Sequence, residues 1–291
     1  MLHLMQPSQA GANGSQQGCN LFDVLVENDS AEERQALAFQ TAVLVPRHAR
    51  FLLSDVTRMR PLLPSSVDTA YHCIVVDPPW ENKSVGRGAK YPTLPSHRLL
   101  GLPIPRLMHP EGVLALWVTN RERLRRFVEE KLLPAWGLVP VAQWFWVKVT
   151  ARGVLVTPLE VAHRRPYEVI LLARKTPSGS TRSHGASQLS VEPAPVAGQP
   201  AAAAVSPAPA AENPARAAGD PAPAIPHNLV LVACPEEHSR KPPLGRLLAP
   251  LLPPQPRCLE LFARNLVAGW TTWGNDALRF QTLDRFKTAR A

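Results

Sequence analysis

The run Asp77-Pro78-Pro79-Trp80 brings together a carboxylate, two rigid residues and a large aromatic ring in four consecutive positions. It follows the apolar segment 72–76, which is typical of a buried strand. Neither proline has an N–H to donate and each fixes its own φ, so the chain cannot continue as a sheet partner or enter a helix directly. The sequence therefore predicts a rigid loop with carbonyls free to accept hydrogen bonds, at the edge where open α/β sheets bind ligands.

Such a loop suits the exocyclic amine of an adenine base. This amine has two N–H donors and a lone pair delocalised into the ring, which makes it a poor nucleophile. The Asp77 carboxylate and the Pro78 carbonyl could each accept one hydrogen and hold the nitrogen in line with a methyl sulfonium, by positioning and electrostatics. Trp80 would then offer a face on which a flipped or single-stranded base stacks. The alternative is a strand-ending turn in which Trp80 is core.

The motif and several further segments resemble the DPPW amino-methyltransferases, the eukaryotic N6-adenosine methyltransferase family. The matching segments are 77–85, 117–120, 146–148, 165–168, 238–243 and 260–265, with Gly269-Trp270 and Trp273-Gly274-Asn275. The resemblance covers about residues 50–283 apart from an insertion. It implies methyl transfer from S-adenosylmethionine to adenine N6 in RNA, with small nuclear RNA as the first candidate and DNA as the second.

The resemblance implies a cofactor pocket formed by Asp77 and by residues far downstream. Lys241 precedes an expected helix, where its ammonium would meet the methionine carboxylate near the helix N-terminus. Arg264 and Asn265 would hold the ribose or the carboxylate, and Asn275 resembles the distal asparagine of the same pocket. A solvated lysine and loop-stabilising hydrogen bonds are the alternative interpretations.

Two features of the cofactor region qualify the resemblance. The motif at Asp77 precedes the cofactor strand at 259–262, an order that implies the permuted branch of amino-methyltransferases. The run Phe262-Ala263-Arg264 departs from the Phe-Gly-Arg of the wider family by one methyl group. That methyl group could crowd the approach of the backbone to the cofactor, although it is typical of this branch.

Two basic loops, 81–95 and 152–168, are expected to bind the substrate strand through its phosphates. The candidate substrate-binding residues are Asn82 and Lys83 in the first loop and Arg164, Arg165 and Glu168 in the second. Glu168 resembles a family acid near the substrate adenosine, but it can equally pair with a basic neighbour. The motifs require no metal.

Short apolar runs alternate with helical patterns along the rest of the chain. They predict a Rossmann-like α/β fold whose mostly parallel sheet carries helices on both faces. The predicted strands are 72–77, 112–118, 141–149, 167–173, 229–234 and 258–263. One amphipathic helix is expected over 124–132 behind a cap at Asn120. A second helix is expected just after Lys241, with Pro242 and Pro243 in its first turn.

Composition divides the chain into parts. Residues 1–20 are polar and predict a disordered leader, and 21–70 predict an extension packed on the core, with a short helix around 32–41. Residues 71–283 form the predicted methyltransferase domain, and 284–291 a tail. Because 25 of the 51 residues in 176–226 are Ala or Pro, this segment is expected to be a disordered insertion within the domain.

Charge points to a nucleic-acid partner. The chain has 32 Lys and Arg against 23 Asp and Glu, a net charge of +9, although a basic surface can also serve solubility alone. No apolar run is long enough to span a membrane, and the N-terminus lacks the plan of a secretory signal. No GxGxxG, P-loop, HExxH or GxSxG motif supports a dinucleotide, nucleoside triphosphate, zinc protease or hydrolase function.

Two rival functions share these features. One is a nucleic-acid-binding partner subunit that has kept the fold and lost catalysis, and the other is an amino-methyltransferase acting on cytosine N4 or a protein amide. Retention of Asp77, Lys241, Arg264 and Asn275 favours an active enzyme over the first rival. The resemblance also implies nuclear work, with the cytoplasm as a second compartment, and a monomer is expected while a partner chain stays open.

Overall fold

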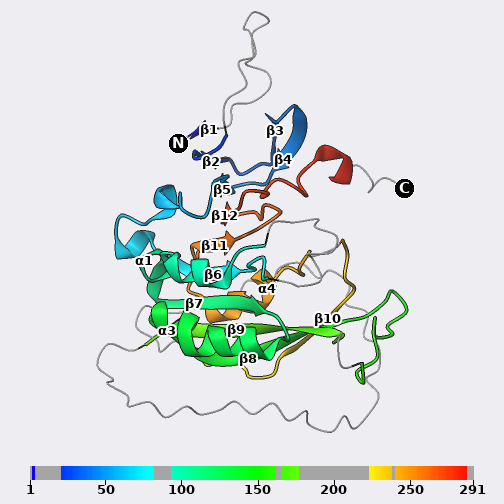
Figure 1. Ribbon diagram of the computed structural model, residues 1–291. Coiled ribbons are helices and arrows are strands. Elements are labelled where there is room, and N and C mark those ends of the chain that lie inside the picture. The colour runs from blue at the N-terminus through cyan, green and yellow to red at the C-terminus, as the bar shows by residue number, and fades with distance from the viewer. Residues whose placement is uncertain are drawn as a thin grey trace, which may run out of the picture.

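The computed structural model describes residues 2–3, 21–81, 93–161, 165–176, 223–237 and 240–286. Ten strands of these residues form one sheet in the order β1-β2-β5-β12-β11-β6-β7-β9-β8-β10 (Figure 1). The strands of the sheet are β1 Leu2–His3, β2 Leu25–Glu27, β5 Arg50–Leu52, β6 Tyr71–Val76, β7 Met108–Val118, β8 Leu138–Lys148, β9 Tyr167–Lys175, β10 Val230–Ala233, β11 Cys258–Leu261 and β12 Trp270–Trp273. A separate hairpin consists of β3 Arg34–Ala38 and β4 Thr41–Val45.

Helices are short. The α-helices are α1 Ile104–Leu107, α2 Glu122–Phe127, α3 Leu133–Ala135 and α4 Gly245–Leu248. The 3-10 helices are η2 Arg60–Leu62, η3 Val67–Thr69, η5 Ser96–Gly101, η7 Ala249–Leu251 and η8 Leu283–Phe286, and η6 Val128–Leu132 is a π-helix that joins α2 to α3. In the described part of the chain, we find no helix with the length and apolar character needed to cross a bilayer.

The centre of the sheet is parallel. β6 pairs in parallel with β11 and β7, and β12 pairs in parallel with β11 and β5. Leu261 and Leu116 both lie opposite Val76, the last residue of β6. The carboxyl ends of β6, β11 and β12 therefore meet at one edge. β9 runs antiparallel to both β7 and β8, so the sheet is mixed.

Each face of the sheet has its own hydrophobic cluster. Ile74 and Val76 belong to the first cluster, to which α1, η6 and α3 contribute buried side chains. Cys73 and Val75 point to the other face and belong to the second cluster, to which α4 contributes Leu248. The predicted fold, a mostly parallel α/β sheet with helices on both faces, is confirmed. All six predicted strands overlap observed strands, whereas β1, β2, β5 and β12 of the sheet were not predicted.

The N-terminal extension is part of the sheet. The prediction of a helix around 32–41 is wrong, because β3 and β4 form an antiparallel hairpin there. Its turn residues Phe39 and Gln40 have φ of 50° and 62°, the left-handed conformation that two-residue hairpin turns require. Farther along, β5 pairs with β12, so the extension continues the central sheet and does not merely pack on it.

Both predicted helix starts are wrong. α2 begins at Glu122 without a side-chain cap, and the Asn120 amide donates instead to the Tyr167 carbonyl over 2.7 Å. α4 begins at Gly245, so Pro242 and Pro243 precede the helix and are not in its first turn. Lys241 consequently does not directly precede the helix, as the prediction required. Proline fixes φ, but it does not itself supply the following hydrogen bonds that start a helix.

Three predicted segment boundaries also change. Within the predicted insertion, 177–222 lie outside the described residues, but 223–226 pack on the domain. Arg174 donates to the Pro223 carbonyl over 3.0 Å, and Trp144 Nε1 donates to the Pro226 carbonyl over 2.8 Å. Within the predicted leader, β1 lies beside β2, and 4–20 are outside the described residues. Within the predicted tail, 284–286 belong to η8.

Candidate active site

Asp77 directly follows β6, the central strand between β11 and β7. Its side chain is 24% exposed, so it is accessible from the edge of the sheet and yet largely removed from water. The location arises because β6 is apolar on both faces and is buried by both hydrophobic clusters. The strand thereby delivers a carboxylate to the edge where β11 and β12 also end.

The two prolines hold a tight loop, but their carbonyls are not free. The Trp80 N–H donates to the Pro78 carbonyl over 2.8 Å, and the Leu94 N–H donates to the Pro79 carbonyl over 3.0 Å. The prediction of free carbonyls is therefore wrong, because the loop uses them for its own turn. A carbonyl oxygen has two lone pairs, so the Pro78 oxygen can still accept one further hydrogen bond.

Trp80 is half-buried and packs against the first hydrophobic cluster. Its indole N–H donates to the Trp117 carbonyl over 2.9 Å, which fixes the orientation of the ring. The core alternative therefore accounts for part of the ring, while the base-stacking role stays a prediction.

Two acids and two lysines meet beside this loop. Lys241 Nζ lies 2.6 Å from Glu168 Oε2 and 3.6 Å from Asp77 Oδ1. Glu168 also forms an ion pair with Lys148. Of the two interpretations of Glu168, pairing with a basic neighbour is the one that the contacts display. Lys241, assigned from the sequence to a cofactor carboxylate, already neutralises two carboxylates of its own chain.

Each of the two ammonium groups lies over the face of an indole ring. Lys241 Nζ lies 5.4 Å from the centre of the Trp117 ring, and Lys148 Nζ lies 4.7 Å from the Trp146 ring. The two rings contact each other edge to face, with centres 5.9 Å apart. A cation over an indole face is stabilised by the ring quadrupole, so each ring helps to hold the ammonium group beside it in place. Sequence reasoning assigned no role to either ring.

Burial and charge shift the pKa values of this group in different directions. Loss of hydration raises the pKa of the Asp77 carboxyl, and Glu168 adds to the rise, while Lys241 and Arg264 oppose it. Burial acts against the charged form of Glu168 as well, but Lys241 and Lys148 outweigh it and lower the pKa. At Lys241, the negative charges of Asp77 and Glu168 outweigh the effect of burial and raise the pKa. Of the two acids, Asp77 is therefore the one whose pKa is raised, and Glu168 is the one whose pKa is lowered.

Glu260 is a functional candidate that sequence reasoning missed. It occupies the middle of β11, where its register partners are Val75 on β6 and Thr272 on β12. Burial, reinforced by the negative charge of Asp77, raises its pKa to about 7. Next to it, Thr272 Oγ1 is buried without a hydrogen-bond partner among the described residues. The detectable signal was one charged residue inside an apolar strand, Cys258-Leu259-Glu260-Leu261.

The remaining predicted cofactor residues lie at the same edge. Arg264 and Asn265 are partly buried after β11, and Arg264 is close enough to Asp77 to influence its pKa. Asn275 is exposed and follows β12. The turn after β11 places the left-handed conformation at Phe262, with φ of 62°. Ala263 has no positive φ, so its departure from glycine causes no backbone strain.

The predicted substrate residues are only partly described. Asn82, Lys83 and Arg164 lie outside the described residues. Arg165 is exposed, and its Nη1 donates to the Leu159 carbonyl over 2.9 Å, which closes the loop that carries it. The structure thus brings Asp77, Glu168 and Lys241 into contact and leaves Arg165 outside that group.

Comparison with known proteins identifies the family to which these motifs belong. The MT-A70 family model matches residues 71–193 and 210–276. The chain belongs to the MT-A70 family. The resemblance drawn from the motif at Asp77 is thereby confirmed. This MT-A70 chain is also similar along 92% of its length to the N(6)-adenine-specific methyltransferase METTL4, with 35% identity to the Mus musculus protein and 37% to the Homo sapiens protein.

A fungal relative supports the same assignment. The chain is 32% identical over 245 residues to the N6-methyladenosine RNA methyltransferase MTA1 of Pyricularia oryzae, covering 81% of this chain and 54% of that protein. The chain covers 50% of each METTL4 relative, so it spans about half the length of the curated relatives that it matches. The shared half contains Asp77, Lys241 and Arg264 of the present sequence.

Proposed function

We propose that this chain transfers a methyl group from S-adenosylmethionine to the N6 amine of adenine in a nucleic acid. The observation that carries the proposal is the placement of Asp77 at the carboxyl end of β6, 3.6 Å from a lysine that it shares with Glu168. Membership of the MT-A70 family and the names of its relatives supply the reaction class.

The residues at this edge fit S-adenosylmethionine. Its ammonium group would find the Asp77 and Glu260 carboxylates, and the orphaned Thr272 hydroxyl beside them. Its carboxylate would find the positive charge of Arg264 or Lys241. Amide side chains at Asn265 and Asn275 suit the ribose hydroxyls. When bound, this cofactor supplies an electrophilic methyl group on a sulfonium centre.

The chain positions the amine. One amine hydrogen is donated to the Asp77 carboxylate and the other to the second lone pair of the Pro78 carbonyl, so the nitrogen lone pair points toward the methyl group. With S-adenosylmethionine bound, the nitrogen would form a bond to the methyl carbon as the bond from that carbon to sulfur breaks, and the methylated amine would then lose one proton. Asp77 can accept this proton because burial raises its pKa, and water can remove it from the partly exposed carboxyl.

The charged group keeps Asp77 in place for this step. Glu168 holds Lys241 at 2.6 Å, and Lys241 in turn keeps the Asp77 carboxylate ionised before the amine enters. The tethered indole of Trp80 offers the stacking surface for the base. Catalysis by such prearranged charges needs no strong base.

RNA is the proposed polymer, with single-stranded DNA as the second. The basic net charge of +9 and the RNA methyltransferase name of the fungal relative support this choice. We further propose work in the nucleus on small nuclear RNA by a monomeric chain. Imaging of the tagged protein tests the compartment, and its mass in solution tests the monomeric state, both separately from the chemistry.

Asp77→Asn tests the reaction directly. It keeps the shape of the side chain and removes its charge, so the rate of methyl transfer should fall by about 10²–10⁴-fold. The measurement is transfer of labelled methyl to RNA and to single-stranded DNA, followed by digestion to nucleosides and mass detection of N6-methyladenine. The exposed acid Asp68 provides the matched control, Asp68→Asn, which should retain activity.

Three outcomes would contradict the proposal. Cofactor binding by the intact chain without methylation of any adenine would identify a noncatalytic partner subunit. Methyl groups recovered on cytosine N4 or on protein amides would assign a different acceptor. Full activity of Asp77→Asn would remove Asp77 from the mechanism.

A further inference from the structure

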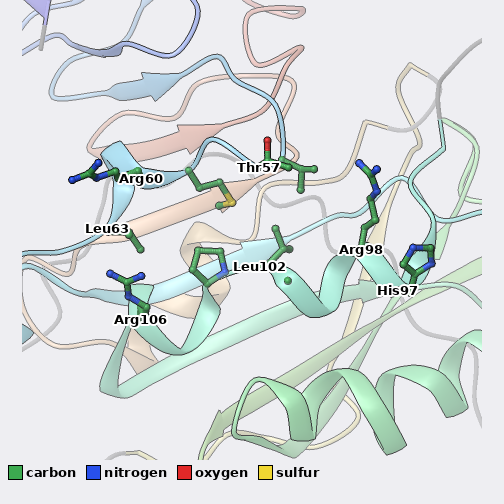
Figure 2. Close-up of a pocket in the computed structure, with 11 residues that line it drawn as sticks. Thr57, Arg60, Leu63, His97, Arg98, Leu102 and Arg106 are labelled. Carbon is green, nitrogen blue, oxygen red and sulfur yellow. The ribbon is translucent and has the colours of Figure 1, made fainter.

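A groove lined by arginines lies next to the first hydrophobic cluster, and its lining residues do not include the group around Asp77. Its volume is about 610 Å³. One wall is the segment after β5, including η2, and the other consists of η5 and the start of α1. Its lining residues are Val56, Thr57, Met59, Arg60, Leu63, His97, Arg98, Gly101, Leu102, Pro103 and Arg106, and we refer to them as the arginine groove (Figure 2).

The chemistry of the arginine groove changes from rim to floor. Arg60, Arg98 and Arg106 are all exposed, and none of its described lining residues is acidic. Asp55 lies near Arg98 but outside the groove, and its carboxylate accepts hydrogen bonds from Thr57. The floor includes Leu102, which is buried. A ligand that fits must carry at least two anionic groups together with a flat or apolar part.

Figure 2 shows how the cations are spread along the arginine groove. Arg60 and Arg106 lie on either side of Leu63 at one end, while Arg98 and His97 lie at the other end, with Leu102 between the two ends. Positive charge at both ends with an apolar centre matches a chain whose successive phosphates flank a base. Guanidinium groups also suit phosphate better than ammonium groups, because they donate in a planar fork.

The arginine groove continues toward the motif. His97 also lines a second groove, of about 1190 Å³, whose charged lining residues are both basic and acidic: Arg121, Arg123, Arg126 and Lys131 with Glu81, Glu122 and Glu130. Glu81 directly follows Trp80, and its carbonyl accepts a hydrogen bond of 2.9 Å from Arg121 Nη1. A polymer that lies in the arginine groove can therefore extend past His97 to the loop that begins at Asp77. A short acidic peptide could satisfy the charges, but nothing would direct it to that loop.

We propose that the arginine groove binds a single-stranded segment of the substrate nucleic acid, outside the nucleotide that is methylated. Phosphates contact Arg60, Arg98 and Arg106, and a base lies on the apolar floor around Leu102. This inference rests on the proposed function for its choice of polymer. It adds a sequence-tolerant contact that holds the strand while the target adenine occupies the site at Asp77.

Binding of a fluorescent 15-nucleotide oligouridine tests the arginine groove without the methylation site, because oligouridine contains no adenine. The double variant Arg60→Glu/Arg106→Glu should bind about 10-fold or more weakly than the unmodified chain. Its dependence of log affinity on log salt should be shallower by about 1.4, since each phosphate contact on a single strand contributes about 0.7. The matched control Arg47→Glu/Arg246→Glu makes the same charge change at exposed sites outside the groove and should bind like the unmodified chain.

Turnover supplies a second readout. With an adenine-containing oligonucleotide of 15 residues, the groove variant should raise KM and leave kcat unchanged. With an adenine trinucleotide, which has few phosphates to contact the groove, the groove variant and the unmodified chain should differ less in KM. Thermal unfolding of every variant establishes that the substitutions leave the fold intact.

Several results would overturn the proposal. They are unchanged oligouridine affinity in the groove variant, an equal loss in the control variant, no oligouridine binding by the unmodified chain, or displacement of oligouridine by an acidic peptide of equal charge at equal concentration. Equal binding of oligouridine and oligothymidine supports the proposal and means that residues outside the groove distinguish ribose from deoxyribose. Because oligouridine binding is measured without methyl transfer, a result against nucleic-acid binding in the groove can be distinguished from a result against the proposed reaction.

Discussion

At the residue scale, the site is a balance of charges more than a set of separate side chains. Lys241 lies between Glu168 and Asp77, and Lys148 provides the second positive charge. Four ionised groups thus sum to no net charge at the edge of a buried sheet. Within this balance, Lys241 offsets part of the hydration that Asp77 loses on burial and so opposes the rise in the pKa of its carboxyl.

Glu260 has the opposite situation, since a second negative charge, Asp77, reinforces the effect of burial. Its pKa rises from an ordinary value of 4.5 to about 7 in the folded chain. The folded state therefore binds more protons than the unfolded state between these two values, and stability falls as pH rises through that window. Above about pH 7 the cost of the ionised, buried carboxylate is complete.

Glu260→Gln removes this cost. Without cofactor, we expect its free energy of unfolding at pH 8 to exceed that of the unmodified chain by up to about 3 kcal/mol, because each pKa unit corresponds to about 1.4 kcal/mol. At pH 4.5 the two proteins should be equally stable. Urea unfolding at both pH values measures the difference, and Glu129→Gln at an exposed position is the control. A gain of the same size at both pH values would show that ionisation of Glu260 is not its cause.

At the element scale, turn geometry determines the secondary structure of segments whose residue propensities do not. The β3–β4 hairpin has Phe39-Gln40 at its turn, where Asn-Gly or Asp-Gly would give the recognisable signal. The segment was therefore mistaken for a helix. Likewise, the crossover helix contains the π-helical turn η6 just before Pro134, a residue that cannot donate to the preceding turn. The sequence predicts this helix, but not its irregularity.

The ends of β11 and β12 are joined by close backbone contact. The Ala263 N–H donates to the Trp273 carbonyl over 3.1 Å, and a Cβ placed on Gly274 would come 2.7 Å from the Ala263 carbonyl oxygen. Since that oxygen belongs to the backbone, it cannot rotate away. Any side chain at Gly274 must displace the turn that carries Arg264.

Gly274→Ala should therefore cost about 1–3 kcal/mol of stability and weaken cofactor binding as well. Thermal unfolding and calorimetric titration with S-adenosylmethionine measure the two effects. Gly245→Ala is the matched control, because its Cβ would lie 3.7 Å from the Trp270 ring, at ordinary contact distance. Alanine favours a helix over glycine, so this control should be neutral or slightly stabilising. Equal behaviour of the two variants would contradict the role of the close contact.

At the scale of the whole molecule, the N-terminal extension completes the sheet. β5 lies between β2 and β12, and the Trp273 indole N–H donates to Ser54 Oγ over 2.8 Å in the buried interior. Phe51 and Leu53 belong to a third hydrophobic cluster, together with Leu266 from the turn after β11. The catalytic domain as drawn from composition, beginning at residue 71, therefore lacks part of its own core.

A chain that starts at Tyr71 should fail to fold cooperatively, because β12 would become an unpaired edge and Trp273 would lose its partner. Circular dichroism during thermal unfolding, and solubility after expression, test this expectation. The companion truncation that removes only residues 1–20 should keep a cooperative transition, since their composition buries little. A sharp transition for the Tyr71 chain would restore the boundary expected from composition.

The sequence by itself determined the strand that ends in Asp77, the order of the motifs and the family, because each depends on local backbone chemistry and on residues close together in the chain. Only the tertiary structure decided which charges meet. Lys241 and Glu168 are 73 residues apart and yet share a hydrogen bond, and the arginine groove joins two separate segments. The raised pKa of Glu260 likewise requires burial and the nearby Asp77. The physical reason is that desolvation and Coulomb energy depend on distance in space, which sequence spacing does not reveal.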